Sequence, residues 1–208
     1  NDHRLGGNEA PPAIISIFIG SDLKKVLKCI ENDLPYDEDI LSRMDIDVDV
    51  LPSFMKDTTD RNRTSPFAFT GNKFEFRMLG STCNIACPNT ILNTIVANSL
   101  CDYADILETS SNIDETINQI IKDTMKKHSR IIFNGNNYAE EWVIEAERRG
   151  LSNFKTAVDV LPHYVDEKNI KLFEKFNVYT KEELQSRCDI LLEEYSKTLN
   201  IEALTMID

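Results

Sequence analysis

The segment at residues 64–79 constrains the fold of this chain most strongly. The dipeptide Gly71-Asn72 has the chemistry of a two-residue hairpin turn and lies between two aromatic-rich arms. A turn there brings the phenylalanines into two cross-strand pairs, Phe69 with Phe74 and Phe67 with Phe76. Because side chains alternate along a strand, these four share one face, and the other face carries Ala68, Thr70, Lys73, Glu75 and Arg77. We predict an antiparallel hairpin with a packing face and a charged face.

Hydrophobic periodicity predicts the remaining elements. A β-branched run at 12–19, closed by Gly20, predicts a buried strand, and the apolar stripe that follows predicts a helix over 22–31. From Pro88 onward the period is helical, and we expect helices over 88–109, 112–128, 137–150, 166–176 and 180–199. Three of them begin with a capping pair, in which Asn or Thr precedes Glu by three residues: Asn112 with Glu115, Asn137 with Glu140, and Thr180 with Glu183.

The order of these elements predicts an α+β fold, with antiparallel strands in the first part and an all-α helical region after it. We place the division near residue 109, which gives a first domain at 1–109 and a helical domain at 110–208. An acidic insertion near 21–51 interrupts the strand region. Its Asp-rich part, 33–51, is expected to be solvated, with at most a marginal strand at its end.

Charge and cysteine content limit the classes of function. The 35 acidic and 23 basic residues give a formal charge of −12, which argues against binding nucleic acid through the overall field. No run reaches the roughly 18 apolar residues of a membrane span. The five cysteines follow no secreted-scaffold spacing, which favours reduced thiols and a cytoplasmic location: Cys29, Cys83, Cys87, Cys101 and Cys188. The chain opens on Asn in a polar stretch, so we expect it to be a fragment.

Two closely spaced pairs could carry chemistry. Arg61 and Arg63 point the same way in an extended backbone and suit a phosphate or carboxylate, although a solvated surface pair is the plainer interpretation. Glu75 and Arg77 share the polar face of the hairpin. Glu75 could bind a hard cation such as Mg²⁺ and Arg77 a substrate carboxylate, or the two could form an ordinary cross-strand ion pair.

The amino-terminal loop is a third candidate. Its two glycines permit movement, and Ala-Pro-Pro at 10–12 then fixes the direction of the chain into a strand. Glu9, at the end of this loop, could close over a site and accept a proton. A polar surface loop is the alternative.

These motifs, in this order, resemble the end of the glutamine synthetase catalytic domain. Two strings are similar to the large type III branch of that family: Asn1-Asp-His-Arg-Leu-Gly-Gly-Asn-Glu-Ala-Pro-Pro and Thr64-Ser-Pro-Phe-Ala-Phe-Thr-Gly-Asn-Lys-Phe-Glu-Phe-Arg77. The helical tail is similar too, through Arg130-Ile-Ile-Phe-Asn-Gly-Asn-Asn-Tyr and the ending Asn200-Ile-Glu-Ala-Leu-Thr-Met. The resemblance therefore covers nearly the whole chain and indicates the carboxy-terminal part of such an enzyme.

The resemblance implies a role for each candidate residue. Arg4 and Arg77 match arginines that hold the glutamate substrate, and Glu9 matches a flap glutamate that helps to deprotonate ammonium. Arg63 matches an arginine at the transferred phosphate, with Arg61 a weaker candidate in the same block. Glu75 matches a divalent-metal ligand on the nucleotide side.

The implied reaction is ligation of ammonia to glutamate through γ-glutamyl phosphate, with ATP and Mg²⁺ or Mn²⁺ as cofactors. The resemblance also implies a homo-oligomer, a dodecamer of the full-length protein, in nitrogen metabolism. Because the other metal ligands are expected upstream, we expect the fragment alone to be inactive. Two alternatives stay open: a γ-glutamyl ligase that uses another amine, and a helical region that serves as an oligomerisation or interaction module.

Overall fold

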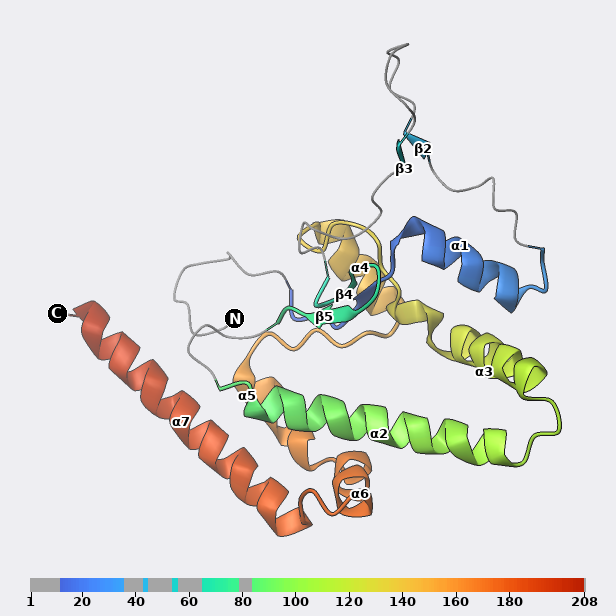
Figure 1. The fold of residues 1–208 in the computed structure, drawn as a ribbon. Coiled ribbons are helices and arrows are strands. Elements are labelled where there is room, and N and C mark those ends of the chain that lie inside the picture. Colours follow the sequence, from blue (N-terminus) through green and yellow to red (C-terminus); the bar gives the residue numbers. More distant parts are fainter. Residues whose placement is uncertain (1–11, 36–42, 45–53, 56–64, 79–83, 208) are drawn as a thin grey trace. The chain divides into compact units, whose positions relative to one another are not determined.

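The computed structural model describes residues 12–35, 43–44, 54–55, 65–78 and 84–207 (Figure 1). The strands are β1 (Ile17–Phe18), β2 (Arg43–Met44), β3 (Phe54–Met55), β4 (Phe67–Phe69) and β5 (Phe74–Phe76). The α-helices are α1 (Gly20–Glu31), α2 (Ala86–Glu108), α3 (Ile113–His128), α4 (Glu140–Arg148), α5 (Ala157–Val160), α6 (Glu167–Lys175) and α7 (Lys181–Ile207). Two 3₁₀ helices complete the order, η2 (Ser129–Ile131) and η3 (Leu161–Val165). The predicted α+β class is confirmed.

A small mixed sheet, in the order β1-β4-β5, contains the predicted hairpin. The antiparallel register joins Phe67 to Phe76, Ala68 to Glu75 and Phe69 to Phe74, which confirms the predicted pairing. The rings of each phenylalanine pair are in contact, with centroids 4.8 Å and 5.2 Å apart. Gly71 has φ of 98°, a conformation that glycine adopts without a Cβ penalty. Strand β1 joins the other side of β4 in parallel, so the sheet is mixed rather than wholly antiparallel.

Burial across this sheet differs from the sequence-based expectation. Phe74, on the supposed packing face, is 55% exposed, whereas Ala68 on the opposite face is fully buried. The reason lies in strand position, because β4 is flanked by a strand on each side and β5 is paired on one side only. The position of a strand within the sheet, and not its aromatic content, determines which side chains are covered.

A second set of contacts extends the sheet beyond β1. Ile132 forms a parallel β-bridge with Ile17, and the Phe133 N–H donates to the Ile17 carbonyl at 3.0 Å. The chain then enters α4, whose Trp142 and Ala146 pack with Ile14 in the main buried cluster of this region. Ile132 and Phe133, which belong to the predicted helical domain, thus lie beside β1.

The predicted helices are confirmed, and their starts test the predicted caps. Thr180 and Glu183 form a reciprocal capping box: the Glu183 N–H donates to Thr180 Oγ1 at 3.2 Å, and the Thr180 N–H donates to Glu183 Oε2 at 2.8 Å. Asn112 Oδ1 accepts from the Glu115 N–H at 3.4 Å, so Asn112 also caps its helix.

The predicted cap at Asn137 is wrong. That side chain is 1% exposed, and α4 begins only at Glu140, with Ala139 as an N-cap that makes no side-chain bond. Asn137 is thus a buried residue that precedes α4 and not its N-cap. The predicted stop at Gly150 is correct, since Gly150 has φ of 68° just after the helix ends.

Contacts divide the chain into two compact units, each with a core of its own. One unit combines the sheet region with 105–151, and it includes the pairing of α1 with α3. The other combines 82–104 with 152–208, and in it Phe173, Leu184 and Cys188 are buried. The predicted division into 1–109 and 110–208 stays a prediction. Most of the acidic segment 33–51 lies outside the described residues, and so does the marginal strand predicted at its end. Strand β2, within this segment, pairs antiparallel with β3, which follows it.

Candidate functional site

Strand β5 presents two of the predicted site residues on one face. Arg77 follows the strand directly, and its Nε and Nη2 donate to Glu75 Oε2 at 3.3 Å and 3.1 Å. Lys73 Nζ lies 3.3 Å from the other carboxylate oxygen, Oε1. The observed ion pair with Arg77 therefore runs along one strand, between residues two apart, and is not the cross-strand pair that the plainer interpretation supposed.

These cations determine the charge state of the Glu75 carboxylate. Hydrogen bonds from Arg77, and then from Lys73, lower the pKa of Glu75 below its usual value. The carboxylate is therefore ionised at neutral pH, as a metal ligand or ion-pair partner must be. The Glu75 side chain is 38% exposed, so a ligand can reach it from solvent.

The two cationic partners differ in how firmly they are held. The Arg77 side chain is 17% exposed and its N–H donates to the Pro66 carbonyl at 2.7 Å, which ties both its ends to the hairpin. The Lys73 side chain is 66% exposed and lies on a flexible stem. Arg77 is therefore the more firmly held of the two cations beside the carboxylate.

The donor chemistry at Glu75 suits a hard divalent cation in part. A carboxylate oxygen is the donor that Mg²⁺ prefers, and the group is already ionised. Within the described ranges, no group of three or more His, Cys, Asp or Glu side chains is arranged to hold a metal. Glu75 is therefore a single candidate ligand, and a complete site needs donors from elsewhere.

Four other predicted site residues lie outside the described residues: Arg4, Glu9, Arg61 and Arg63. Their predicted roles stay predictions.

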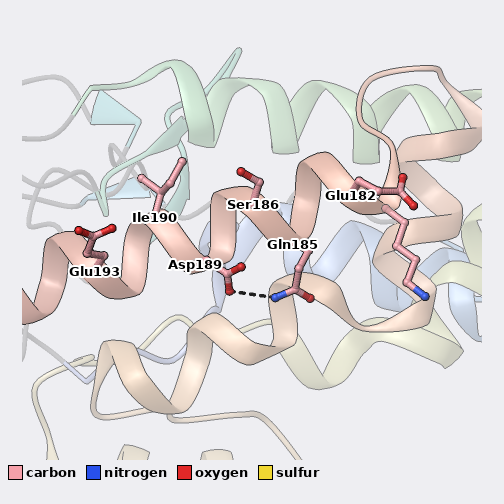
Figure 2. Close-up of a pocket in the computed structure, with 7 residues that line it drawn as sticks. Glu182, Gln185, Ser186, Asp189, Ile190 and Glu193 are labelled. Atoms are coloured by element: carbon pink, nitrogen blue, oxygen red, sulfur yellow. Dashed lines mark hydrogen bonds between the residues drawn. The ribbon is translucent and has the colours of Figure 1, made fainter.

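Two surface hollows in the described part of the chain contain none of the predicted site residues. One is lined only by residues of α7, and Figure 2 shows them along that helix, with Gln185 Nε2 donating to Asp189 Oδ1 at 3.0 Å. A hollow lined by one helix is poorly suited to enclosing a ligand. A second lies between α1 and α3, where Lys122 forms an ion pair with Asp33.

Sequence reasoning missed the segment that supports this sheet from the far side. Ile131-Ile132-Phe133 is a short β-branched and aromatic run, followed by Asn134-Gly135, and such a pattern is typical of a strand that ends in a turn. In the sequence this segment contributes only to the family resemblance. The run Ile131–Phe133 is too short to show the alternation of a strand, so its strand-like pairing is recognised only from its partner β1.

The comparisons with known proteins agree with this arrangement of motifs. Residues 116–208 match the glutamine synthetase C-terminal domain family. The carboxy-terminal half of the chain thus belongs to the glutamine synthetase C-terminal domain family, and the whole chain is similar to the carboxy-terminal part of glutamine synthetases, one of them named a type-3 enzyme.

Three curated relatives match essentially the whole chain. A type-3 glutamine synthetase of Dictyostelium discoideum is 46% identical over 211 residues, covering 100% of this chain and 29% of the relative. Glutamine synthetases of Butyrivibrio fibrisolvens and Bacteroides fragilis are 45% and 38% identical, over 99% and 100% of this chain. The chain spans 29% to 30% of the length of these relatives. In the described part of the chain, no helix combines the length and apolar character that a membrane crossing requires.

Proposed function

We propose that this chain supplies part of the active site of an ATP-dependent ligase that joins ammonia to glutamate. One observation carries the proposal: Arg77, directly after β5, donates two hydrogen bonds to the carboxylate of Glu75 in that strand, so a guanidinium and a carboxylate lie side by side. The names of the relatives support it, since all three are glutamine synthetases.

In this proposal each residue has a defined chemical task. The glutamate γ-carboxylate attacks the terminal phosphorus of ATP, ADP leaves, and γ-glutamyl phosphate forms. Glu9 takes a proton from ammonium, and the resulting ammonia attacks the acyl carbon while phosphate leaves. Arg63, with Arg61 beside it, stabilises charge on the moving phosphoryl group.

Arg77 and Arg4 hold the carboxylate groups of the amino acid, which keeps the γ-carboxylate in line with the phosphorus. Glu75 is a ligand for Mg²⁺ or Mn²⁺, which when bound neutralises phosphate charge on the nucleotide side. In this proposal the Arg77 guanidinium, which lies beside Glu75, serves the amino-acid site next to the metal ligand.

The experiment uses the full-length protein that contains this chain. We expect glutamine formation and phosphate release that require glutamate, ammonia and ATP together. Arg77→Ala should raise the KM for glutamate by at least about 10-fold, because a charge-assisted contact to the substrate is lost. Arg148→Ala is the control, because Arg148 also forms an ion pair with a glutamate, Glu145, but lies on α4 and away from the proposed site residues. Wild-type protein that forms no glutamine, or an Arg77→Ala variant with unchanged KM, contradicts the proposal.

A panel of amines in the same assay distinguishes ammonia from larger amine substrates. Faster product formation with a polyamine than with ammonia would favour a different γ-glutamyl ligase.

Exposed apolar side chains support a second function, in oligomer contacts. Near the end of α7, Leu204 and Ile207 are 65% and 81% exposed. Exposed apolar side chains on long helices indicate surfaces that a partner covers. We therefore propose that the helical region helps to assemble a homo-oligomer of cytoplasmic enzyme. Deletion of α7 from the full-length protein should reduce the assembly size in light scattering, and an unchanged size contradicts this role.

A further inference from the structure

We propose that Asn134 is a positioning residue for the Glu75–Arg77 site, acting through strand β1. This inference rests on the proposed function of that site. Among the described residues no hydrogen bond joins Asn134 to Glu75 or Arg77, so its effect is transmitted through β1 and then through two strand pairings, β1 with β4 and β4 with β5.

The Asn134 side chain binds the main chain at the point where β1 ends. Its Oδ1 accepts from the Ile19 N–H at 3.1 Å, and its Nδ2 donates to the Gly20 carbonyl at 2.9 Å. The preceding contacts, Ile132 beside Ile17 and the Phe133 N–H on the Ile17 carbonyl, form a short parallel ladder. The side-chain amide thus extends the ladder by one more step, in the manner of a peptide group.

The residue that Asn134 binds, Ile19, follows a set of three paired residues, one on each strand, that ends at Glu75. Phe18 of β1 is in register with Ala68 of β4, and Ala68 is in register with Glu75 of β5. Asn134 fixes the residue immediately after Phe18. Any displacement of β1 along its axis therefore shifts Ala68 and Glu75 through paired backbone, and Arg77 follows because it is bound to Glu75.

The opposite end of β1 is also fixed. Ser65 Oγ, just before β4, donates to the Ser16 carbonyl at 2.8 Å, and both serines are buried. Ser65 thus holds one end of β1 against the start of β4, and Asn134 holds the other end against the segment that contains Ile132 and Phe133. Removing Asn134 releases one end only, so the sheet is expected to survive with a looser register.

Only an amide of this length provides both bonds. Asp accepts but does not donate at neutral pH, and it would place negative charge beside the Gly20 carbonyl. Ala provides neither bond and leaves a buried N–H at Ile19, which is 6% exposed, without that partner. The requirement for simultaneous donation and acceptance explains the choice of Asn.

The Asn134 segment is itself anchored to α4 and its end. Arg149 Nη1 donates to the Ile132 carbonyl at 3.0 Å, and its Nε donates to Glu145 Oε1 at 2.6 Å. Arg130 Nη1 donates in return to the carbonyls of Arg149 and Gly150 at 3.4 Å and 3.3 Å. The segment can therefore hold β1 against a fixed support.

The test compares Asn134→Ala with Asn136→Ala in the full-length protein. Asn136 belongs to the same loop, but its Oδ1 accepts only locally, from the Tyr138 N–H at 3.0 Å. We expect Asn134→Ala to raise the KM for glutamate about 10-fold while kcat changes by less than about twofold. The Asn136→Ala variant should keep the wild-type values.

The split between KM and kcat separates positioning from stability. A variant that is merely less stable contains fewer active molecules, which lowers the apparent kcat and leaves KM unchanged. Assays run well below the unfolding temperature of each variant therefore give a clear answer. A reduced kcat with unchanged KM would overturn the proposal.

Asn134→Asp provides a second variant in case the alanine variant does not fold. It retains the acceptor for Ile19 and loses the donor to Gly20, and the KM for glutamate should again rise. Hydrogen exchange should be faster in peptides from β4 and β5 than in wild type, with no change in α7. If neither variant folds, or if exchange in β4 and β5 is unchanged, Asn134 has no positioning role.

Failure of the proposed function gives a different result. In that case the wild-type protein forms no glutamine, and no KM can be measured for any variant. Active wild-type protein with identical KM values in all variants refutes only the role of Asn134.

Discussion

The ring of Phe133 lies flat against the indole of Trp142, with centroids 3.7 Å apart and planes inclined by 11°. Phe133 belongs to the segment beside β1, and Trp142 belongs to α4. The stack thus connects the sheet extension to the helix that supports it. The Arg149 guanidinium lies 5.4 Å from the indole centroid and adds a cation–π contact.

Removing the indole should destabilise this unit strongly. Trp142 is 1% exposed and belongs to the buried cluster with Ile14 and Ala146. We expect Trp142→Ala to lower the free energy of unfolding by about 3–5 kcal/mol, as for other buried aromatics. Urea unfolding followed by far-UV circular dichroism measures the change. Ile144→Ala, at a position 70% exposed on the same helix, should change stability by less than about 0.5 kcal/mol.

Residue 135 must be glycine because the Phe133 ring occupies the space that a Cβ would need. A Cβ at Gly135 would lie 2.7 Å from Cζ of Phe133, so the ring must move and the stack on Trp142 must open. We expect Gly135→Ala to destabilise the protein by about 1–3 kcal/mol. In a Phe133→Leu background the same substitution should cost much less. Equal costs in both backgrounds, measured by urea unfolding, would show that the ring is not the reason.

Glu145 should make stability depend on acidic pH. Hydrogen bonds from Arg148 and then Arg149 lower the pKa of Glu145 from 4.5 to about 2. A carboxylate with a lowered pKa in the folded state stabilises the protein above its unfolded pKa, and the contribution is lost as the pH falls through the folded pKa. The stability difference between wild type and Glu145→Gln should therefore be greatest above about pH 5 and shrink towards pH 2.

The Glu145 prediction is checked by urea unfolding over that pH range. Glu147→Gln, at an exposed position on the same helix, serves as the control. A difference between wild type and Glu145→Gln that is constant with pH would mean that Glu145 acts through packing rather than charge.

The capping box at the start of α7 should contribute measurably to stability. Thr180→Ala removes the acceptor for the Glu183 N–H, and we expect a loss of about 1 kcal/mol. Thr205 is a suitable control, because its hydroxyl donates within the helix to the Ile201 carbonyl and caps nothing. Thermal unfolding of Thr180→Ala and Thr205→Ala tests this directly. Equal effects from the two substitutions would rule out a capping contribution.

Local patterns proved sufficient where the physical cause was itself local. The hairpin register follows from Gly71-Asn72, and the capping box follows from Thr180 and Glu183, because each involves residues close in sequence. The Glu75–Arg77 contact belongs with these, since residues two apart on a strand share a face.

Contacts between distant residues could not be read in this way. Asn137 has the spacing of a helix cap, yet its side chain is buried, with 1% exposed, and does not cap α4. Nor did any pattern indicate that Phe133 and Asn134 would lie beside β1, more than a hundred residues away.

By itself, the sequence determined the α+β class, the hairpin and its register, most of the helices, and the shared face of Glu75 and Arg77. Only the tertiary structure decided that β4 is the central strand, that Ala68 is buried while Phe74 is exposed, and that Asn134 fixes the end of β1. The physical reason is that turn chemistry, strand alternation and helix capping act within a few residues. Burial and sheet order depend instead on which distant segments exclude water together.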